Sequence, residues 1–292
     1  MSAPGQGLEA RGGDRGSGDA VGAAGHGIPR PAWLSSLASG NIGAVLERGF
    51  AVVRNQNWMV LASGFFEPVF YLLAMGIGMG ALVGTVTGPG GQPVEYAAYI
   101  APALLATSAM NGAIYDSTWN VFFKLRFAKL YQAMLQTSLG PLDVALGEIL
   151  MALFRGFLYA LGFLGVIAAM GLVTSWWSLL MVPAAVLIAL GFAALGMGVT
   201  SYLTSFQQMD LINFALLPMF LFSATLYPIA VYPDWIQWSI MAMPLWHGVE
   251  LMRQLSVGHF DALTWVHALY FVGMTLIGLV LTTVRLRTLF LR

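Results

Sequence analysis

Four ionisable residues lie within otherwise apolar stretches of the sequence, and they are the first candidates for chemistry: Glu67, Asp116, Glu148 and Arg155. On insertion scales a charge at the centre of a membrane helix costs about 2.5 to 3.5 kcal/mol, so such side chains face protein or water. Helix geometry places Glu67 and Arg155 near the midplane of a bilayer and the other two nearer the cytoplasm. We therefore expect Arg155 to pair with Glu67 or with Asp116. Such a pair either fixes the register of two helices or lines a substrate route.

The remaining residue types exclude several kinds of catalysis. The chain has no cysteine, which excludes disulfides and thiolate metal sites. Its two lysines, Lys124 and Lys129, follow Phe123 and Ala128, whereas the P-loop of an ATPase ends in Gly-Lys. The four histidines show no metal-ligand spacing, so we expect neither a metal nor a cofactor on this chain.

The composition indicates a membrane protein. Of the 292 residues, 58% are hydrophobic and 9% are charged, and the mean hydropathy is +0.77. Soluble domains carry about 25% charged residues, so an ordinary water-soluble fold is excluded. Residues 1–40 are rich in glycine, alanine and proline and lack the apolar core of a signal peptide. We predict that they form a disordered cytoplasmic tail.

Apolar stretches of span length predict an all-α membrane protein with six transmembrane helices. A bilayer core of about 30 Å needs about 20 apolar helical residues. Nearly all basic residues near span ends share one side if the N-terminus is cytoplasmic. The chain is therefore predicted to be a multi-pass membrane protein with both termini in the cytoplasm. Its frequent arginine, glycine and alanine suggest a bacterial genome rich in G and C, so the membrane is predicted to be a bacterial plasma (inner) membrane. The predicted spans are 57–83, 97–122, 143–171, 178–203, 209–228 and 263–284.

Two amphipathic segments lie outside these spans. Residues 41–56 have apolar and charged side chains on opposite helical faces, which predicts an interfacial helix; a short helix packed on protein is the alternative. Residues 124–139 carry a second apolar stripe, which ends at Gly140-Pro141, where a new helix can begin. This segment suits contact with a cytoplasmic partner, unless it is a mere spacer. The residues assigned to it are Arg126, Phe127, Lys129, Leu130, Tyr131, Met134 and Leu135.

The stretch between the last two spans is too apolar for a simple water-exposed loop. Prolines divide it, and its tyrosine and tryptophan rings favour the headgroup zone of a bilayer. We predict external re-entrant helices within 234–256, separated at Met243-Pro244, that enter the outer leaflet. His247 and Glu250 lie about one helical turn apart and are the best acid–base pair for a lipid-modifying enzyme. The candidate residues of this region are Pro228, Pro233, Trp235, Pro244, His247, Glu250 and Arg253.

Two stretches of the sequence resemble one transporter family. They are FFKLRFAKLYQAMLQTSLGPLDVALGE at 122–148 and MFLFSATLYPIAVYPDWIQWSIMAMPLWHGVELMR at 219–253. The chain departs from the family pattern at Ala224, where glycine is usual, and at Thr137-Ser138, where Thr-Pro is usual. Residues 41–292 resemble the ABC-2 family of exporter permeases, particularly its NodJ-type lipooligosaccharide exporters and daunorubicin-type drug-resistance permeases. The matching positions are Ser223, Tyr227-Pro228, Pro233-Asp234-Trp235, Pro244-Leu245 and Val249 to Arg253.

This resemblance implies a function and a set of partners. Residues 124–139 would be the coupling helix that receives the motion of two ABC ATPase subunits, which bind ATP and magnesium. The chain would pair with a second permease, either a copy or a paralogue, and no nucleic acid is expected as a partner. It would export an amphiphile, which is a drug, a lipid or a lipid-linked glycan. The intramembrane candidates for the route are Glu67, Asn111, Tyr115, Asp116, Arg155 and Asn213.

Two other classes fit a polytopic membrane protein. A secondary transporter or channel driven by an ion gradient would show internal repeats and broken helices in corresponding halves, and the sequence shows neither. A membrane enzyme acting on lipids would place paired acids or histidines at one membrane face, for which His247 and Glu250 are the best pair. A neighbouring gene for a P-loop ATPase would favour the ABC transporter, whereas an isolated gene would weaken it.

Overall fold

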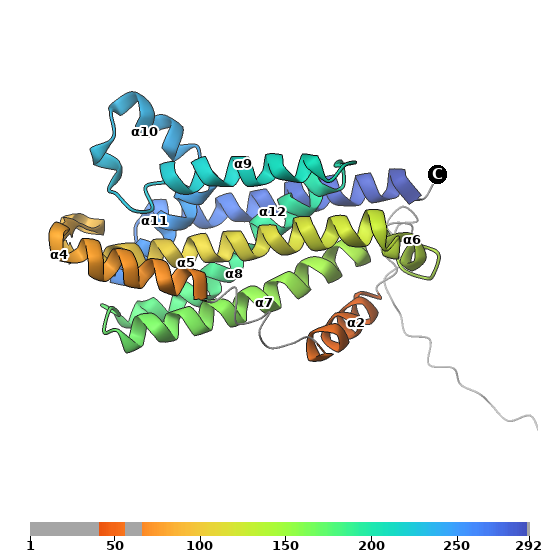
Figure 1. Ribbon diagram of the computed structural model, residues 1–292, viewed down its shortest axis with the longest axis horizontal. Helices are drawn as coiled ribbons and strands as arrows, with labels where there is room; N and C mark the ends of the chain where they lie inside the picture. The colour runs from red at the N-terminus through yellow and green to blue at the C-terminus, as the bar shows by residue number, and fades with distance from the viewer. Residues whose placement is uncertain (1–40, 56–65, 291–292) are drawn as a thin grey trace, which may run out of the picture. The chain divides into compact units, whose positions relative to one another are not determined.

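The structure of the chain is a computed structural model, and it describes residues 41–55 and 66–290 (Figure 1). The chain divides into two units, Met1–Pro31 and Ala32–Arg292, and all described residues belong to the second. The predicted tail 1–40 and the first part of the predicted span 57–83 lie outside the described residues.

Five helical segments of the described chain are long and apolar enough to cross a membrane, and each corresponds to a predicted span. The sixth predicted span, 209–228, corresponds to helix α9 (Gln207–Phe222), which has 16 residues and is shorter than the five. The all-α membrane fold is therefore confirmed, whereas the count of six spans stays a prediction. The five segments are Phe66–Val83, Tyr96–Phe127, Pro141–Ala169, Trp176–Thr200 and Ala262–Leu289.

Three stretches of these segments are π-helical: η1 in the first span, and η3 and η4 at the end of the second. Such stretches are rare and occur often at functional sites. Asp116 is the first residue of η3, and Lys124 lies in η4. The charged residues Asp116 and Lys124 of the second span therefore lie in its π-helical part. The elements of the five segments are η1 (Leu72–Met79), α4 (Gly80–Val83), α5 (Tyr96–Tyr115), η3 (Asp116–Asn120), η4 (Phe123–Phe127), α7 (Pro141–Ala169), η5 (Trp176–Leu180), α8 (Met181–Thr200) and α12 (Ala262–Phe290).

Helix α8 is the centre of the bundle, because it contacts α5, α7 and α12, which run alongside it (Figure 1). Lipid tails are as apolar as leucine, so membrane helices associate by close packing and hydrogen bonds. Glycine allows this closeness between α8 and α12. A Cβ at Gly278 would lie 2.3 Å from the carbonyl carbon of Ala194, and a Cβ at Gly191 would lie 2.9 Å from Phe271 Cδ1.

Helix α2 (Ile42–Asn55) corresponds to the predicted interfacial helix 41–56, and it packs on α7. Val45 of α2 is buried, and a Cβ at Gly147 of α7 would lie 2.4 Å from its Cγ1. Phe50 meets Phe154 edge to face, with 5.0 Å between the ring centroids. Part of the apolar face of α2 is therefore covered by α7, although Phe50 remains 46% exposed.

The predicted helix 124–139 is divided in the structure rather than continuous. Its parts are η4 and α6 (Leu130–Leu135), because Lys129 adopts a left-handed backbone with φ 48° between them. Pro141 begins α7, and the amide of Gly140 donates to Asp143 Oδ2 at 3.0 Å.

The far end of the bundle contains a hairpin and the region before α12. Strands β1 (Thr85–Thr87) and β2 (Pro93–Glu95) pair antiparallel, with Val86 opposite Val94, across the turn η2 (Pro89–Gly91). The predicted re-entrant region 234–256 forms α10 (Asp234–Met241) and α11 (Pro244–Val257), which follow the short turn η6 (Ile229–Val231). Helix α11 packs on α5, α8 and α12.

Candidate functional site

Two ion pairs join α7 to the second span. Arg155 Nη1 lies 2.5 Å from Asp116 Oδ1, and Lys124 Nζ lies 2.5 Å from Glu148 Oε2. Arg48 of α2 approaches the other oxygen of Glu148 at 4.0 Å. Of the two acids expected for Arg155, the structure selects Asp116. We call the end of the bundle that carries Arg48, Lys124 and Glu148 the basic end, and the Arg155–Asp116 pair lies about two turns further along α7.

The order of these charges specifies how the two helices align. The second span carries Asp116 and, about two turns later, Lys124; α7 carries Glu148 and, at a matching interval, Arg155. Because the helices run in opposite directions, both contacts are attractive in the observed register. A shift by two turns would oppose Asp116 to Glu148 or Lys124 to Arg155, which are like charges. The pairs therefore hold one register where unpaired charge is costly.

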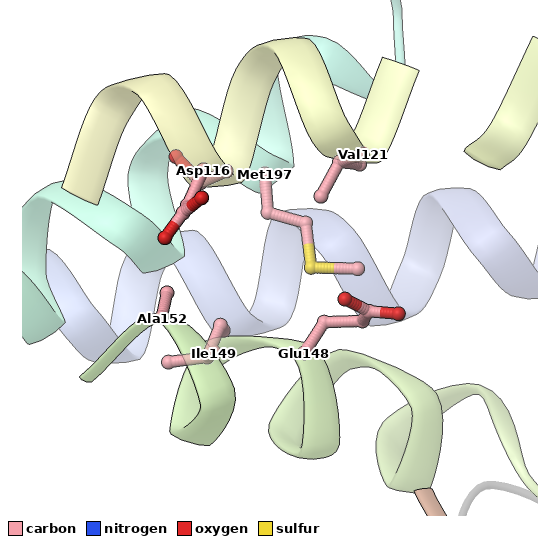
Figure 2. A pocket seen from close by; sticks show the side chains of 7 residues that line it. Asp116, Val121, Glu148, Ile149, Ala152 and Met197 are labelled. Atoms are coloured by element: carbon pink, nitrogen blue, oxygen red, sulfur yellow. The ribbon is translucent and has the colours of Figure 1, made fainter. Parts of the chain in front are cut away.

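The two carboxylates face one small pocket. Figure 2 shows Asp116 and Glu148 on either side of the Met197 side chain, which comes from α8. The Asn120 amide donates to Asp116 Oδ1 at 2.8 Å. Because each carboxylate is paired with a cation, the charges around the pocket are balanced. The other lining residues are Ser117, Val121, Ile149 and Ala152.

Helix α6 turns four of the predicted coupling residues toward the bundle. Tyr131, Met134 and Leu135 are buried, and Leu130 packs against the same core. Burial raises the pKa of the Tyr131 phenol well above its ordinary value, and the nearby charge of Glu148 raises it further. The phenol is therefore neutral at physiological pH, and α6 packs on α7 beside the ion pairs.

The other three predicted coupling residues lie in or beside η4. Phe127 is exposed and stacks on Phe123, which is also exposed, with 5.6 Å between the ring centroids. The left-handed residue Lys129 is exposed and separates η4 from α6, which explains why Phe127 leaves the buried stripe. Arg126 turns to the connection between α8 and α9, where its Nε and Nη2 donate to the carbonyl of Leu203 at 3.0 and 2.6 Å.

The remaining intramembrane candidates are spread over three elements. Glu67 is exposed on the first span, and Tyr115 and Asn213 are exposed on α5 and α9. Asn111 is half-buried on α5. Their assignment to a substrate route stays a prediction.

At the other end of the bundle, Arg253 of α11 is 2% exposed and joins three elements. Its Nη2 donates to the carbonyls of Ala224 (2.7 Å) and Thr225 (3.0 Å), and its Nε donates to the carbonyl of Tyr99 at 3.4 Å. The guanidinium lies 3.8 Å from the centre of the Tyr99 ring and pairs with Glu250 at 3.2 Å. The planar guanidinium thus donates hydrogen bonds and also stacks on an aromatic ring. These contacts connect α11 to α5 and to the segment that follows α9.

The chain reverses direction after α9 at Ala224, which has φ 54°. Glycine adopts this left-handed conformation readily, whereas other residues lose about 1 kcal/mol. Ala224 stands where glycine is usual in the pattern quoted above, so this alanine keeps the backbone conformation that a glycine would favour.

The prolines and tryptophans of the re-entrant region mark its boundaries and its outer surface. Pro228 precedes η6, Pro233 precedes α10, and Pro244 is the first residue of α11. Trp235 and Trp238 are each 75% exposed on α10. Such rings suit the headgroup zone of a bilayer.

His247 and Glu250 do not form an acid–base pair in the structure. His247 Nδ1 lies 2.8 Å from Nδ1 of His267, and its ring stacks on Tyr270 with 4.1 Å between centroids. Glu250 pairs with Arg253 instead. The histidine therefore joins α11 to α12, and this geometry does not support the lipid-modifying enzyme.

The contacts of Lys124 and Arg126 at the basic end were not predicted. The pair between Lys124 and Glu148 has a sequence signal, since charges at matching intervals on neighbouring spans can form two pairs at once. The bond from Arg126 to the Leu203 carbonyl has none, because every residue offers a carbonyl.

These features define a polytopic α-helical membrane protein with one ion pair near the middle of a spanning helix and a second nearer one end. The chain belongs to the ABC-2 type transporter family, whose model matches residues 41–257. It is similar to Nodulation protein J of Rhizobium leguminosarum bv. trifolii, at 31% identity over 230 residues, which are 77% of this chain and 86% of the relative. Nodulation protein J of Rhizobium leguminosarum bv. viciae is 29% identical over 238 residues, 80% of this chain and 90% of the relative.

Family membership confirms the predicted resemblance and sets the class of function. The chain is a membrane subunit of an ABC transporter, and it spans the membrane several times. Proteins of this family work in association with an ABC ATPase.

Proposed function

We propose that this chain is the permease subunit of an ATP-driven exporter that moves an amphiphile out of the cytoplasm or the inner leaflet. The observation that carries the proposal is the arrangement at the basic end. Helix α6 packs on α7, and α7 is tied to the second span by Arg155–Asp116 and Glu148–Lys124. A force on the segment 123–135 therefore reaches two spanning helices together.

The partner that supplies this force is an ABC ATPase, with two copies in each complex. Phe123 and Phe127 present stacked, exposed rings beside Lys129, and aromatic anchors of this kind are common at protein interfaces. ATP and magnesium bind to the ATPase. A second permease, a copy or a paralogue, completes the assembly in the bacterial inner membrane, with the basic end in the cytoplasm.

Exposed apolar surface supports an amphiphilic substrate. Helix α9 exposes Leu211, Phe214 and Leu217, and Asn213 is exposed among them. A route along α9 would offer apolar contacts to a lipid-like tail and a few polar groups to a head. Tyr115 and Asn111 of α5 are further polar candidates for a substrate route.

The test is transport by the reconstituted complex. The chain is co-expressed with the ABC ATPase encoded in the same genome, purified as a complex and placed in proteoliposomes with a fluorescent phospholipid as the probe. We expect movement of the probe that needs ATP, and no hydrolysis by the permease alone. The matched control is an ATPase whose P-loop lysine is replaced, which should abolish movement. Hydrolysis by the permease alone, or movement driven by an ion gradient without ATP, would contradict the proposal.

A further inference from the structure

Within this chain, helix α9 packs loosely along its length. One of its 16 residues, Met209, is buried, whereas 13 of the 20 residues of α8 are. Its inner face meets the core through side chains that are only partly buried, such as Leu216 and Phe220. Because membrane helices are held by packing and hydrogen bonds, this limited packing means that the rest of this chain offers little resistance to displacement of α9. Pro218 also removes one hydrogen bond within the helix.

The segments that flank α9 on both sides are each held by an arginine from another element. At the basic end, Arg126 of η4 donates two hydrogen bonds to the carbonyl of Leu203, at 3.0 and 2.6 Å. At the other end, Arg253 of α11 donates to the carbonyls of Ala224 and Thr225, at 2.7 and 3.0 Å. The helix is thus secured at its two ends more firmly than between them.

The connection from Leu203 to α9 is short and braced. Gln208 Oε1, in the first turn of α9, accepts hydrogen bonds from the amides of Thr204 (2.8 Å) and Ser205 (3.4 Å). Phe206 meets Trp119 edge to face, with 5.1 Å between the ring centroids. A displacement of Leu203 therefore carries the first turn of α9 with it.

We propose that Arg126 is a positioning residue that transmits displacement of the segment 123–135 to α9, which pivots about its anchor at Arg253. This inference rests on the proposed function, because it takes the ATPase as the source of the displacement. A 16-residue helix is about 24 Å long, so a shift of about 2 Å at the basic end tilts it by about 5°. Arginine suits this role, because its planar fork places two donors on one carbonyl and lysine cannot.

The chain has no cysteine, so one introduced cysteine gives a specific reporter. Leu211 is 66% exposed on α9, and Leu211→Cys can carry an environment-sensitive fluorophore in the complex of the full chain with its ATPase in nanodiscs. The readout is the change in emission on addition of ATP and vanadate, divided by the amount of nucleotide trapped. We expect Arg126→Met to lower this ratio by about tenfold, since a hydrogen bond to a charged group shifts an equilibrium by about that factor. Arg126→Lys should give an intermediate ratio.

The matched control is Arg287→Gln, which removes another positive charge near the C-terminal end of α12, where Arg287 is exposed. We expect it to leave the ratio unchanged. An unchanged ratio in an assembled Arg126→Met complex would overturn the inference, and so would an equal loss in Arg287→Gln. If Arg126→Met does not assemble, Arg126→Lys decides: a reduced ratio supports the inference and a full one overturns it. A parent complex that traps no nucleotide would contradict the proposed function itself, which separates the two failures.

Discussion

Glu148 is the residue on which the basic end converges. It contacts Lys124 of η4 and Arg48 of α2, and it lies beside the buried phenol of Tyr131 in α6. Three short elements are therefore positioned by one carboxylate on α7. Its side chain is 9% exposed, so removal of its charge leaves its partners without compensation in a largely dry environment.

The first prediction concerns this carboxylate. Glu148→Gln should lower the free energy of unfolding by about 2 kcal/mol, which is below the loss typical of a fully buried pair because Lys124 is 29% exposed. Thermal unfolding of the detergent-purified chain, followed by tryptophan fluorescence, measures the change. Glu47→Gln is the matched control, since Glu47 is exposed on α2. Equal stability of the two variants would contradict the role of Glu148.

A second prediction is a pH dependence that arises from His247. Burial lowers its pKa from 6.5 to about 4, and the neighbouring His267 acts in the same direction. Between these two values the unfolded chain binds more protons than the folded chain, so stability is lost as the pH falls through this window. The midpoint of thermal unfolding should therefore decrease from pH 7 to pH 5.

His247→Gln, which does not titrate, should make this decrease shallower. His259→Gln should leave it as steep as in the parent, because His259 is exposed. If the slope is the same in all three proteins, His247 is not its source.

At the scale of elements, the contact between α8 and α12 depends on the absence of side chains. Gly278 lies against the backbone of Ala194 and Leu195, which cannot rotate away as a flexible side chain would. Backbone-to-backbone approach of this kind is a common way for membrane helices to gain contact area and hydrogen-bond weakly. The backbones of the two helices consequently approach each other closely.

The third prediction tests this contact. Gly278→Ala should destabilise the protein by about 1 to 3 kcal/mol, because the added Cβ would lie 2.3 Å from a backbone carbon. Gly273→Ala on the same helix is the control, since a Cβ there meets nothing within 4 Å. The control should be neutral or slightly stabilising, because alanine favours helix by about 1 kcal/mol over glycine. A denaturant or thermal series on both variants gives the difference, and the idea fails if Gly278→Ala is as stable as the control.

The elements differ in how far the sequence predicts them. The long spans follow from length and hydropathy, because the bilayer sets both. The hairpin of β1 and β2 carries no such signal, since three-residue strands are too short to show a period of two. The break in the helix at Lys129 likewise has no signal in the sequence. A lysine in the left-handed conformation is held there by its surroundings rather than by its own backbone preference.

For the candidate site too, the sequence predicts what depends on one residue and its own segment, but not what depends on which helices are neighbours. That Arg155 needs an acidic partner follows from the cost of an unpaired charge in the bilayer. That the partner is Asp116 rather than Glu67 depends on which helices are neighbours, which the pattern of one chain does not specify. The contact of Arg126 with the connection between α8 and α9 depends on a backbone carbonyl, so no sequence motif indicates it.

At the scale of the whole molecule, the two ends of the bundle have opposite character. Arg48, Lys124 and Arg126 belong to the basic end, whereas the exposed rings of Trp235 and Trp238 belong to the other. Positive charge near span ends favours the cytoplasm, and tryptophan favours the headgroup zone. This asymmetry supports the predicted orientation in the membrane.

The fourth prediction is the outcome of labelling in intact cells. A membrane-impermeant maleimide should react with Asp234→Cys on α10 in intact bacteria after the outer membrane is made permeable. It should react with Gln132→Cys on α6 only after the inner membrane is opened. Both positions are exposed, and the chain has no cysteine of its own to interfere. The reverse pattern of labelling would overturn both the orientation and the docking of an ATPase at α6.

The contacts of Arg253 also bear on biosynthesis. Its partners, the carbonyls of Tyr99, Ala224 and Thr225 and the carboxylate of Glu250, all precede it in the chain. All the hydrogen-bond acceptors are therefore synthesised before Arg253. The guanidinium can form these bonds as soon as it leaves water. We expect arrested nascent chains that extend well past Val257 to shield Arg253 from an arginine-modifying reagent, even before α12 has been inserted.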